Sequence, residues 1–164
     1  MLNSFLKIGL VSLTIPLLMN AQAEAKNKGK VPKDAVALSA EEVKAIYVDK
    51  TFTFQPTPIV YFNTDGTLSG VDIMKGHEGF IDGTWKIDGN EMCTERHFHV
   101  SDKTKNGGDA ECRKFSKVGK VVYTQYVKGW DVFVGDVMTG FDKIATPGDA
   151  VSAKVEALHK KFGY

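Results

Sequence analysis

The residues of this chain with the clearest chemical potential lie between its only two cysteines. Cys93 is followed at intervals of two by Glu95, His97 and His99, and Cys112 closes the segment. On a β-strand this spacing places the side chains on one face, where two imidazoles can converge on a metal ion such as zinc or copper. An H-x-H pair lacks a third and a fourth ligand. His97 and His99 are therefore weak metal candidates, and a solvent-facing polar strand face is the simpler interpretation.

The two cysteines favour a structural role. A bridge between Cys93 and Cys112 would close a loop of roughly 20 residues, worth about 3 kcal/mol in the chain-entropy model. Asn106-Gly107-Gly108 offers a reversal of chain direction between them. A free catalytic thiol would need a reducing compartment or an activating base. We therefore predict a disulfide between Cys93 and Cys112.

The opposite face of the same predicted strand is more apolar and is expected to point inward. It carries Arg96, and a buried guanidinium needs a carboxylate or an anionic ligand beside it. We expect a ligand site here, formed by Arg96 together with the aromatic residues Trp85, Tyr123 and Tyr126. An internal salt bridge explains Arg96 equally well, and filling the core is the alternative role for the aromatic side chains.

Motifs and composition exclude several classes of function. The chain has no G-x-S-x-G elbow, no phosphate-binding P-loop and no H-E-x-x-H zinc motif, and no nucleophile–base pair can be named. We therefore expect neither an enzyme nor a cofactor. The formal net charge is +1, which gives no reason to expect a nucleic acid as partner.

The N-terminus has the three parts of a secretory signal peptide. A short start with one lysine precedes the apolar run 8–19, and Ala21–Ala25 contains two overlapping A-x-A cleavage sites. The run is shorter than the ~20 apolar residues that span a bilayer, so we expect cleavage and no stable membrane insertion. The predicted organisation is a signal peptide over 1–25, a flexible basic leader over 26–37 and one domain over 38–164. The mature protein is then periplasmic or secreted.

Two helices are predicted at the ends of this domain. The first spans Ala40–Val48, where Ser39 and Glu42 form a capping box in front of an apolar face. The second spans Pro147–Phe162, with proline at its first position and an apolar stripe along one side.

Between the helices the hydrophobic period is two, which predicts a mainly β fold. Turn signals such as Asp65-Gly66 and Gly89-Asn90 separate about eight short strands, and no segment between them is long enough for a crossover helix. The pattern favours an antiparallel meander that forms a small lipocalin-like barrel. The predicted strands are Thr51–Phe54, Ile59–Phe62, Thr67–Ile73, Gly83–Asp88, Glu91–Val100, Lys114–Val118, Lys120–Val127 and Trp130–Val134.

Several of these segments also resemble a known family. Leu38–Tyr47, Lys50-Thr-Phe, Tyr61–Gly66 and Gly83–Cys93, with a second cysteine about twenty residues on, are similar to small exported bacterial proteins grouped as domain of unknown function 995. The resemblance covers about Leu38 to Val134. It implies a secreted, calycin-like β-domain and brings no activity, cofactor or site residues.

Three functions follow as expectations. The first is a binding module for a small amphipathic or anionic ligand, held in or at the mouth of the barrel. The second is an envelope interaction or inhibitor module that uses a loop or sheet edge and needs no cavity. The third is metal binding through His97 and His99.

Overall fold

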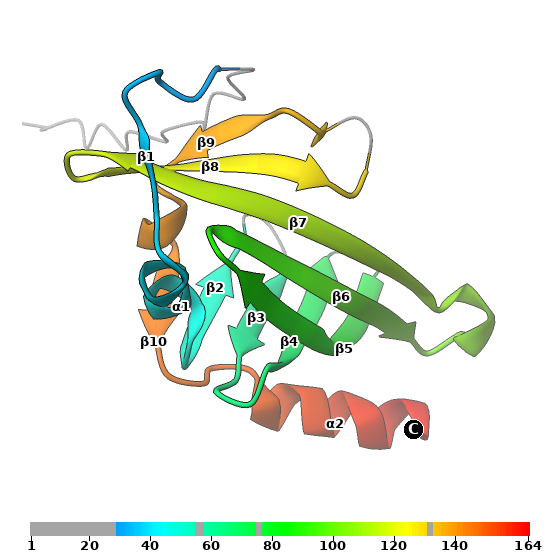
Figure 1. The fold of residues 1–164 in the computed structure, drawn as a ribbon. Coiled ribbons are helices and arrows are strands. Elements are labelled where there is room, and N and C mark those ends of the chain that lie inside the picture. Colours follow the sequence, from blue (N-terminus) through cyan, green and yellow to red (C-terminus); the bar gives the residue numbers. More distant parts are fainter. Residues whose placement is uncertain (1–28, 55–57, 75–76, 131–132) are drawn as a thin grey trace, which may run out of the picture.

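The computed structural model describes residues 29–54, 58–74, 77–130 and 133–164, and one antiparallel sheet dominates it (Figure 1). Nine of the strands in these residues pair in the order β10-β2-β3-β4-β5-β6-β7-β8-β9, and the short β1 pairs with β7 outside this path. The strands are β1 Val36–Ala37, β2 Lys50–Thr53, β3 Ile59–Phe62, β4 Thr67–Met74, β5 His77–Asp88, β6 Glu91–Val100, β7 Gly107–Val118, β8 Val121–Lys128, β9 Val137–Thr139 and β10 Ala145–Pro147.

The predicted antiparallel meander is confirmed, but the sheet is a half-barrel and not a small closed barrel. The strands β9 and β10 stand at the two ends of the pairing order. They are consecutive in the chain and are joined by a 3-10 helix, η3 (Phe141–Lys143), whose Phe141 is buried in the core. The chain therefore passes from one edge to the other through a turn anchored by one buried side chain, Phe141, instead of through direct pairing.

Several strand boundaries differ from the prediction. β7 begins at Gly107 and not at Lys114, so Gly107 and Gly108 extend a strand, and a 3-10 helix, η1 (Lys103–Lys105), precedes them in the reversal. The strand predicted over 130–134 is wrong in its described part, because Trp130 and Phe133 lie in the connection between β8 and β9. β9 and β10 were not predicted; each has only three residues, too few to show a period.

The N-terminal helix is confirmed as α1 (Ala40–Tyr47). The Ser39 hydroxyl accepts a hydrogen bond from the Glu42 amide at 3.2 Å, and the Glu42 carboxylate accepts one from the Ser39 amide at 2.8 Å. This reciprocal pair satisfies two donors at the helix start. The buried face of α1 carries Val43, Ile46 and Tyr47. Just before the helix, Val36–Ala37 pairs with β7, so the last two residues of the expected leader lie in the sheet.

The C-terminal helix α2 (Ser152–Phe162) starts five residues later than predicted. Pro147 pairs with Lys50 as part of β10, and the Asp149 carboxylate accepts hydrogen bonds from the Val151 and Ser152 amides at 2.9 and 3.0 Å. The helix packs on one face of β4 and β5, which we call the outer face (Figure 1). Within the described residues, no helix has the length and apolar character needed to cross a membrane.

The main core lies on the opposite, inner face of the sheet. Tyr47 of α1 is fully buried at its centre, surrounded by aromatic rings at centroid distances between 4.9 and 6.3 Å. These rings belong to Phe52, Phe62, Trp85, Phe115 and Phe141. Aromatic side chains from α1, β2, β3, β5, β7 and η3 therefore fill much of the interior.

Candidate functional site

Charged residues gather on the inner face of β6 and β7, next to the aromatic core. Alternation along each strand fixes which side chains point there. Met92 and Phe115 are buried in the core, so Arg96 on β6 and Glu111 and Arg113 on β7 share the inner face with them. Asp109 lies directly opposite Arg96 in the strand register and completes the group. We call Arg96, Asp109, Glu111 and Arg113 the charged cluster.

The charged cluster is a continuous chain of ion pairs. Arg96 binds Asp109 with two hydrogen bonds, from Nε at 2.8 Å and from Nη2 at 3.0 Å. Arg96 Nη2 also donates to the Glu111 carboxylate at 3.0 Å, and the other oxygen of Glu111 accepts from Arg113 Nε at 3.1 Å. Each of the four side chains is only 13–14% exposed, so these are partly desolvated pairs that retain a little contact with solvent.

The electrostatics of the cluster favour the charged forms of Glu111 and Arg96. Burial raises the pKa of the Glu111 carboxyl, but the guanidinium groups of Arg113 and Arg96 outweigh that effect and the net pKa is below the ordinary value. Burial likewise lowers the pKa of Arg96, and Glu111 and Asp109 more than compensate, so its pKa is raised. With two cations and two anions, the cluster has a formal charge of zero.

Three hydroxyl groups in the same region are buried without hydrogen-bond partners in the described part of the chain. They belong to Tyr47, Thr94 and Thr124, whose residues are at most 4% exposed. Thr94 lies directly opposite Glu111. Thr124 lies on the inner face of β8, directly opposite Phe115. Burial raises the pKa of Tyr47 well above its ordinary value. The charged groups of Arg113, Glu111 and Arg96 have smaller effects on the same pKa.

A buried polar group left without a partner costs about 1–3 kcal/mol, and in native structures most such groups bind ordered water or another molecule. The inner face beside the charged cluster therefore has unused hydrogen-bonding capacity.

An aromatic surface flanks the charged cluster. The Arg113 guanidinium lies over the Tyr126 ring with its carbon 5.0 Å from the centroid, and Arg96 lies 5.9 Å from the Phe98 centroid. Tyr126 also contacts the Phe133 ring at 6.0 Å, and its oxygen accepts a hydrogen bond from the Trp130 amide at 3.1 Å. A polar cluster thus borders directly on apolar rings.

The four residues predicted to bind a ligand do not form one surface. Arg96 and Tyr126 both lie on the inner face, next to Glu111 and Arg113. Trp85 belongs to the aromatic core, where its indole nitrogen donates to two backbone carbonyls at 3.1 and 3.0 Å. Tyr123 pairs with Ser116 on the opposite face of the sheet. Neither Trp85 nor Tyr123 is part of the cluster.

Sequence reasoning missed the other three members of the charged cluster. Asp109, Glu111 and Arg113 recur at intervals of two, which on a strand places all three on one face. That signal was readable from the sequence. It went unused because the predicted strand began at Lys114, and this start left all three residues in a connection.

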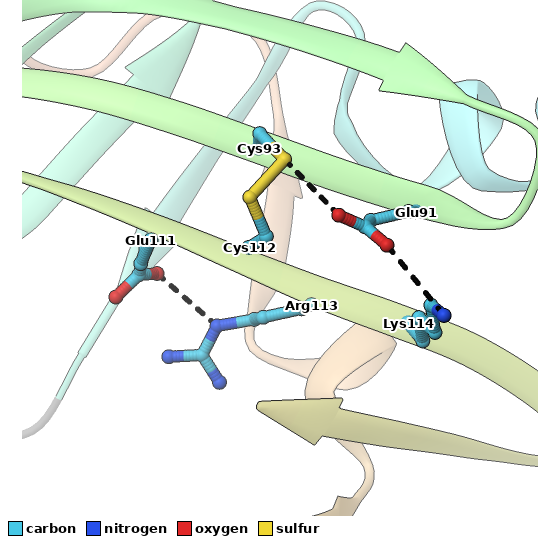
Figure 2. The surroundings of a disulfide bond; sticks show 6 residues. All are labelled: Glu91, Cys93, Glu111, Cys112, Arg113 and Lys114. Carbon is cyan, nitrogen blue, oxygen red and sulfur yellow. Dashed lines mark hydrogen bonds and ion pairs between the residues drawn. A yellow bond between two sulfur atoms is a disulfide. The ribbon is translucent and has the colours of Figure 1, made fainter. Parts of the chain in front are cut away.

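The structure joins Cys93 and Cys112 in a disulfide across β6 and β7 (Figure 2). The two cysteines are directly opposed in the register, and Glu111 and Arg113 project from β7 on the other side of the sheet. Glu91 lies beside Cys93 and pairs with Lys114 at 3.8 Å. The disulfide therefore fixes the two strands that carry the charged cluster.

The candidate metal ligands His97 and His99 lie on the disulfide side of β6, both beside Asp82 of β5. Among the described residues, one group of three potential metal-ligating side chains has all its donor atoms within 4.8 Å of one another: Glu91, Cys93 and Cys112. Its two sulfur atoms are bonded to each other, so this group offers no thiolate to a metal ion.

Comparison with known proteins identifies a family and no characterised relative. The model of the family described as "Protein of unknown function (DUF995)" matches residues 14–146, which is most of the chain. No curated protein and no solved structure matches.

Proposed function

Since the chain belongs to this family, whose description assigns no activity, we propose from the geometry alone that it binds a small amphipathic ligand on the inner face of the half-barrel. The proposed site consists of the charged cluster, which solvent reaches, and of the buried Thr94 and Thr124 hydroxyls and the Tyr126 ring, which a ligand would reach from the cluster. The observation that carries the proposal is the set of unpartnered buried hydroxyls around a charged cluster that solvent still reaches.

The charge balance of the site favours a neutral polar group on the ligand over an anion. Each guanidinium of the cluster already contacts a carboxylate, and Arg96 contacts two. An incoming anion would have to compete with Asp109 and Glu111 while also facing their negative charge. A hydroxyl or amide group would instead pair with the free hydroxyls of Thr94 and Thr124.

The apolar part of the ligand has a matching surface. Phe98 and Phe133 are partly exposed, Tyr126 beside them is 5% exposed, and burial of apolar area contributes about 25 cal/mol per Å². Because aromatic side chains fill the interior around Tyr47, the ligand lies at the cluster and does not extend into that part of the core.

A fluorescent neutral amphiphile tests this function. We expect phenylnaphthylamine to bind the full chain with saturable fluorescence enhancement, and octyl glucoside, whose sugar carries several hydroxyls, to displace it. In Thr94→Val and Thr124→Val, the loss of one hydrogen bond of about 1 kcal/mol should weaken octyl glucoside binding roughly fivefold. Both variants should also be slightly more stable than the wild type, because each loses an unpartnered buried hydroxyl.

Thr84→Val is the matched control. Thr84 is exposed and pairs with Glu95, which lies on the face opposite the charged cluster. This substitution should leave both binding and stability unchanged. Equal octyl glucoside affinity in the wild type and in both inner-face variants would refute the proposed site, and so would the absence of saturable binding.

A second candidate function is binding of an envelope protein through the connection between β8 and β9. Trp130 and Val134 in this connection are 61% and 49% exposed, so two large apolar side chains of one connection face solvent. Trp130→Ser separates the two functions. It would remove binding of a protein partner and leave the hydroxyls and charges of the inner face intact. Export, on which an envelope partner depends, stays a prediction, because the signal peptide lies outside the described residues.

A further inference from the structure

A second group of chemically active residues lies on the outer face, away from the proposed ligand. His97 of β6 is directly opposite Asp82 of β5 in the strand register, and His99 lies two residues further along the same face of β6. The sequence reveals the two histidines but not their carboxylate, because the predicted strand began at Gly83 and left Asp82 in a turn. The sheet brings these three residues together.

The Asp82 carboxylate lies between the two imidazole rings. Its Oδ1 is 3.2 Å from His97 Nδ1, and its Oδ2 is 2.9 Å from His99 Nε2. Both ring nitrogens of His99 are buried, and neither makes a hydrogen bond with acceptable geometry, the short contact with Asp82 included. A buried imidazole without a hydrogen bond is costly. A ligand that accepts a lone pair from His99 would remove that cost.

One of the three side chains packs between aromatic rings, and the other two are about half exposed. The His99 ring stacks on Phe80 at a centroid distance of 4.5 Å and meets the Tyr164 ring edge-on at 5.0 Å. His97 and Asp82 are about half exposed. Ligand binding would therefore order two surface side chains around one preorganised imidazole.

We propose that His97, His99 and Asp82 bind a divalent transition-metal ion of the zinc class. Two imidazoles and one carboxylate form a donor set that zinc takes in proteins, with a fourth position left for water. The observed nitrogen–oxygen separations are close to those between ligands of a single ion with bond lengths near 2.0–2.2 Å. The donor atoms of these three side chains do not all lie within 4.8 Å of one another, so the half-exposed His97 side chain would have to turn toward His99 for all three to reach one ion. Imidazole nitrogens also bind copper(II), and the site has no thiolate that would favour copper(I). Copper(II) therefore fits the same donors.

Zinc itself is the probe for this site. We expect the full chain to bind one Zn²⁺ per molecule in isothermal titration calorimetry, and Co²⁺ at the same site to show visible absorption bands from nitrogen and oxygen ligands. His97→Gln and Asp82→Asn replace the two adjustable, exposed ligands, so the fold should tolerate both. Each should weaken Zn²⁺ binding by at least about tenfold, the lower limit of what loss of even an outer partner costs a metal site.

His77→Gln is the matched control. His77 is also an exposed histidine with a carboxylate beside it, because its Nε2 lies 3.5 Å from an oxygen of Asp72. This substitution should leave Zn²⁺ affinity unchanged. The proposal is overturned if the wild type binds no Zn²⁺ stoichiometrically, if His97→Gln binds as tightly as the wild type, or if His77→Gln loses as much affinity as His97→Gln.

Discussion

Glu111 is the residue on which the inner-face site depends most. It links the two arginines of the charged cluster and lies directly opposite Thr94. The sequence predicted that Arg96 points inward and needs either a carboxylate or an anionic ligand, and the structure supplies two carboxylates. It did not predict Glu111, because strand boundaries are weakly encoded where charged residues alternate with small ones, as in the stretch from Gly107 to Arg113.

Glu111→Gln should lower the free energy of unfolding by about 3 kcal/mol at neutral pH, because it leaves two partly buried guanidinium groups without full compensation. Urea denaturation measures this difference. Glu95→Gln is the control, since Glu95 is exposed on the other face of the neighbouring strand and should change stability by less than about 0.5 kcal/mol.

The stability difference between the wild type and Glu111→Gln should also depend on pH. The folded-state pKa of Glu111 is depressed, so its contribution is fully present above the unfolded-state pKa of about 4.3 and is lost as the pH falls through the lower folded-state value. The stability difference between wild type and Glu111→Gln should therefore shrink below about pH 4. A difference that stays constant down to acid pH would contradict this role.

At the scale of elements, the strands β6 and β7 carry two different groups of polar residues on their two faces. Alternation places the charged cluster on the inner face and the disulfide, His97 and His99 on the other. The sequence predicted this division for β6, because its period of two runs unbroken from Glu91 to Val100. It predicted α1 through its capping box, whereas α2 was predicted to start too early because Pro147 suits a strand end as well as a first helical turn.

The disulfide should stabilise this pair of strands without taking part in binding. Cys93→Ser/Cys112→Ser removes a cross-link between residues 19 apart and should lower the free energy of unfolding by about 3 kcal/mol. The affinity of the folded variant for phenylnaphthylamine should be unchanged. Urea unfolding with and without a reductant measures the effect.

The reductant provides the control within this experiment. It should destabilise the wild type to the level of the double variant and leave the variant itself unchanged. A wild type that is equally stable in both conditions would show that the cross-link contributes nothing.

At the scale of the molecule, the order of the strands from β2 to β8 was predictable, whereas the two edge strands and the closure of the barrel were not. Period-two segments separated by turn residues define a meander whatever its final curvature. Closure depends on the last strands, and here β9 and β10 have three residues each while Phe141 between them enters the core. Three residues of strand leave no readable pattern. The half-barrel leaves the charged cluster in contact with solvent, as the proposed ligand requires.

A high-resolution crystal structure of the protein grown with octyl glucoside tests the proposed binding site most directly. We predict the sugar on the inner face beside the charged cluster, with a polar atom within about 2.7–3.2 Å of the Thr94 or the Thr124 hydroxyl. The alkyl chain should lie along Tyr126 and Phe133. The opposite result would be an inner face without detergent, in which protein groups alone satisfy the hydroxyls of Tyr47, Thr94 and Thr124.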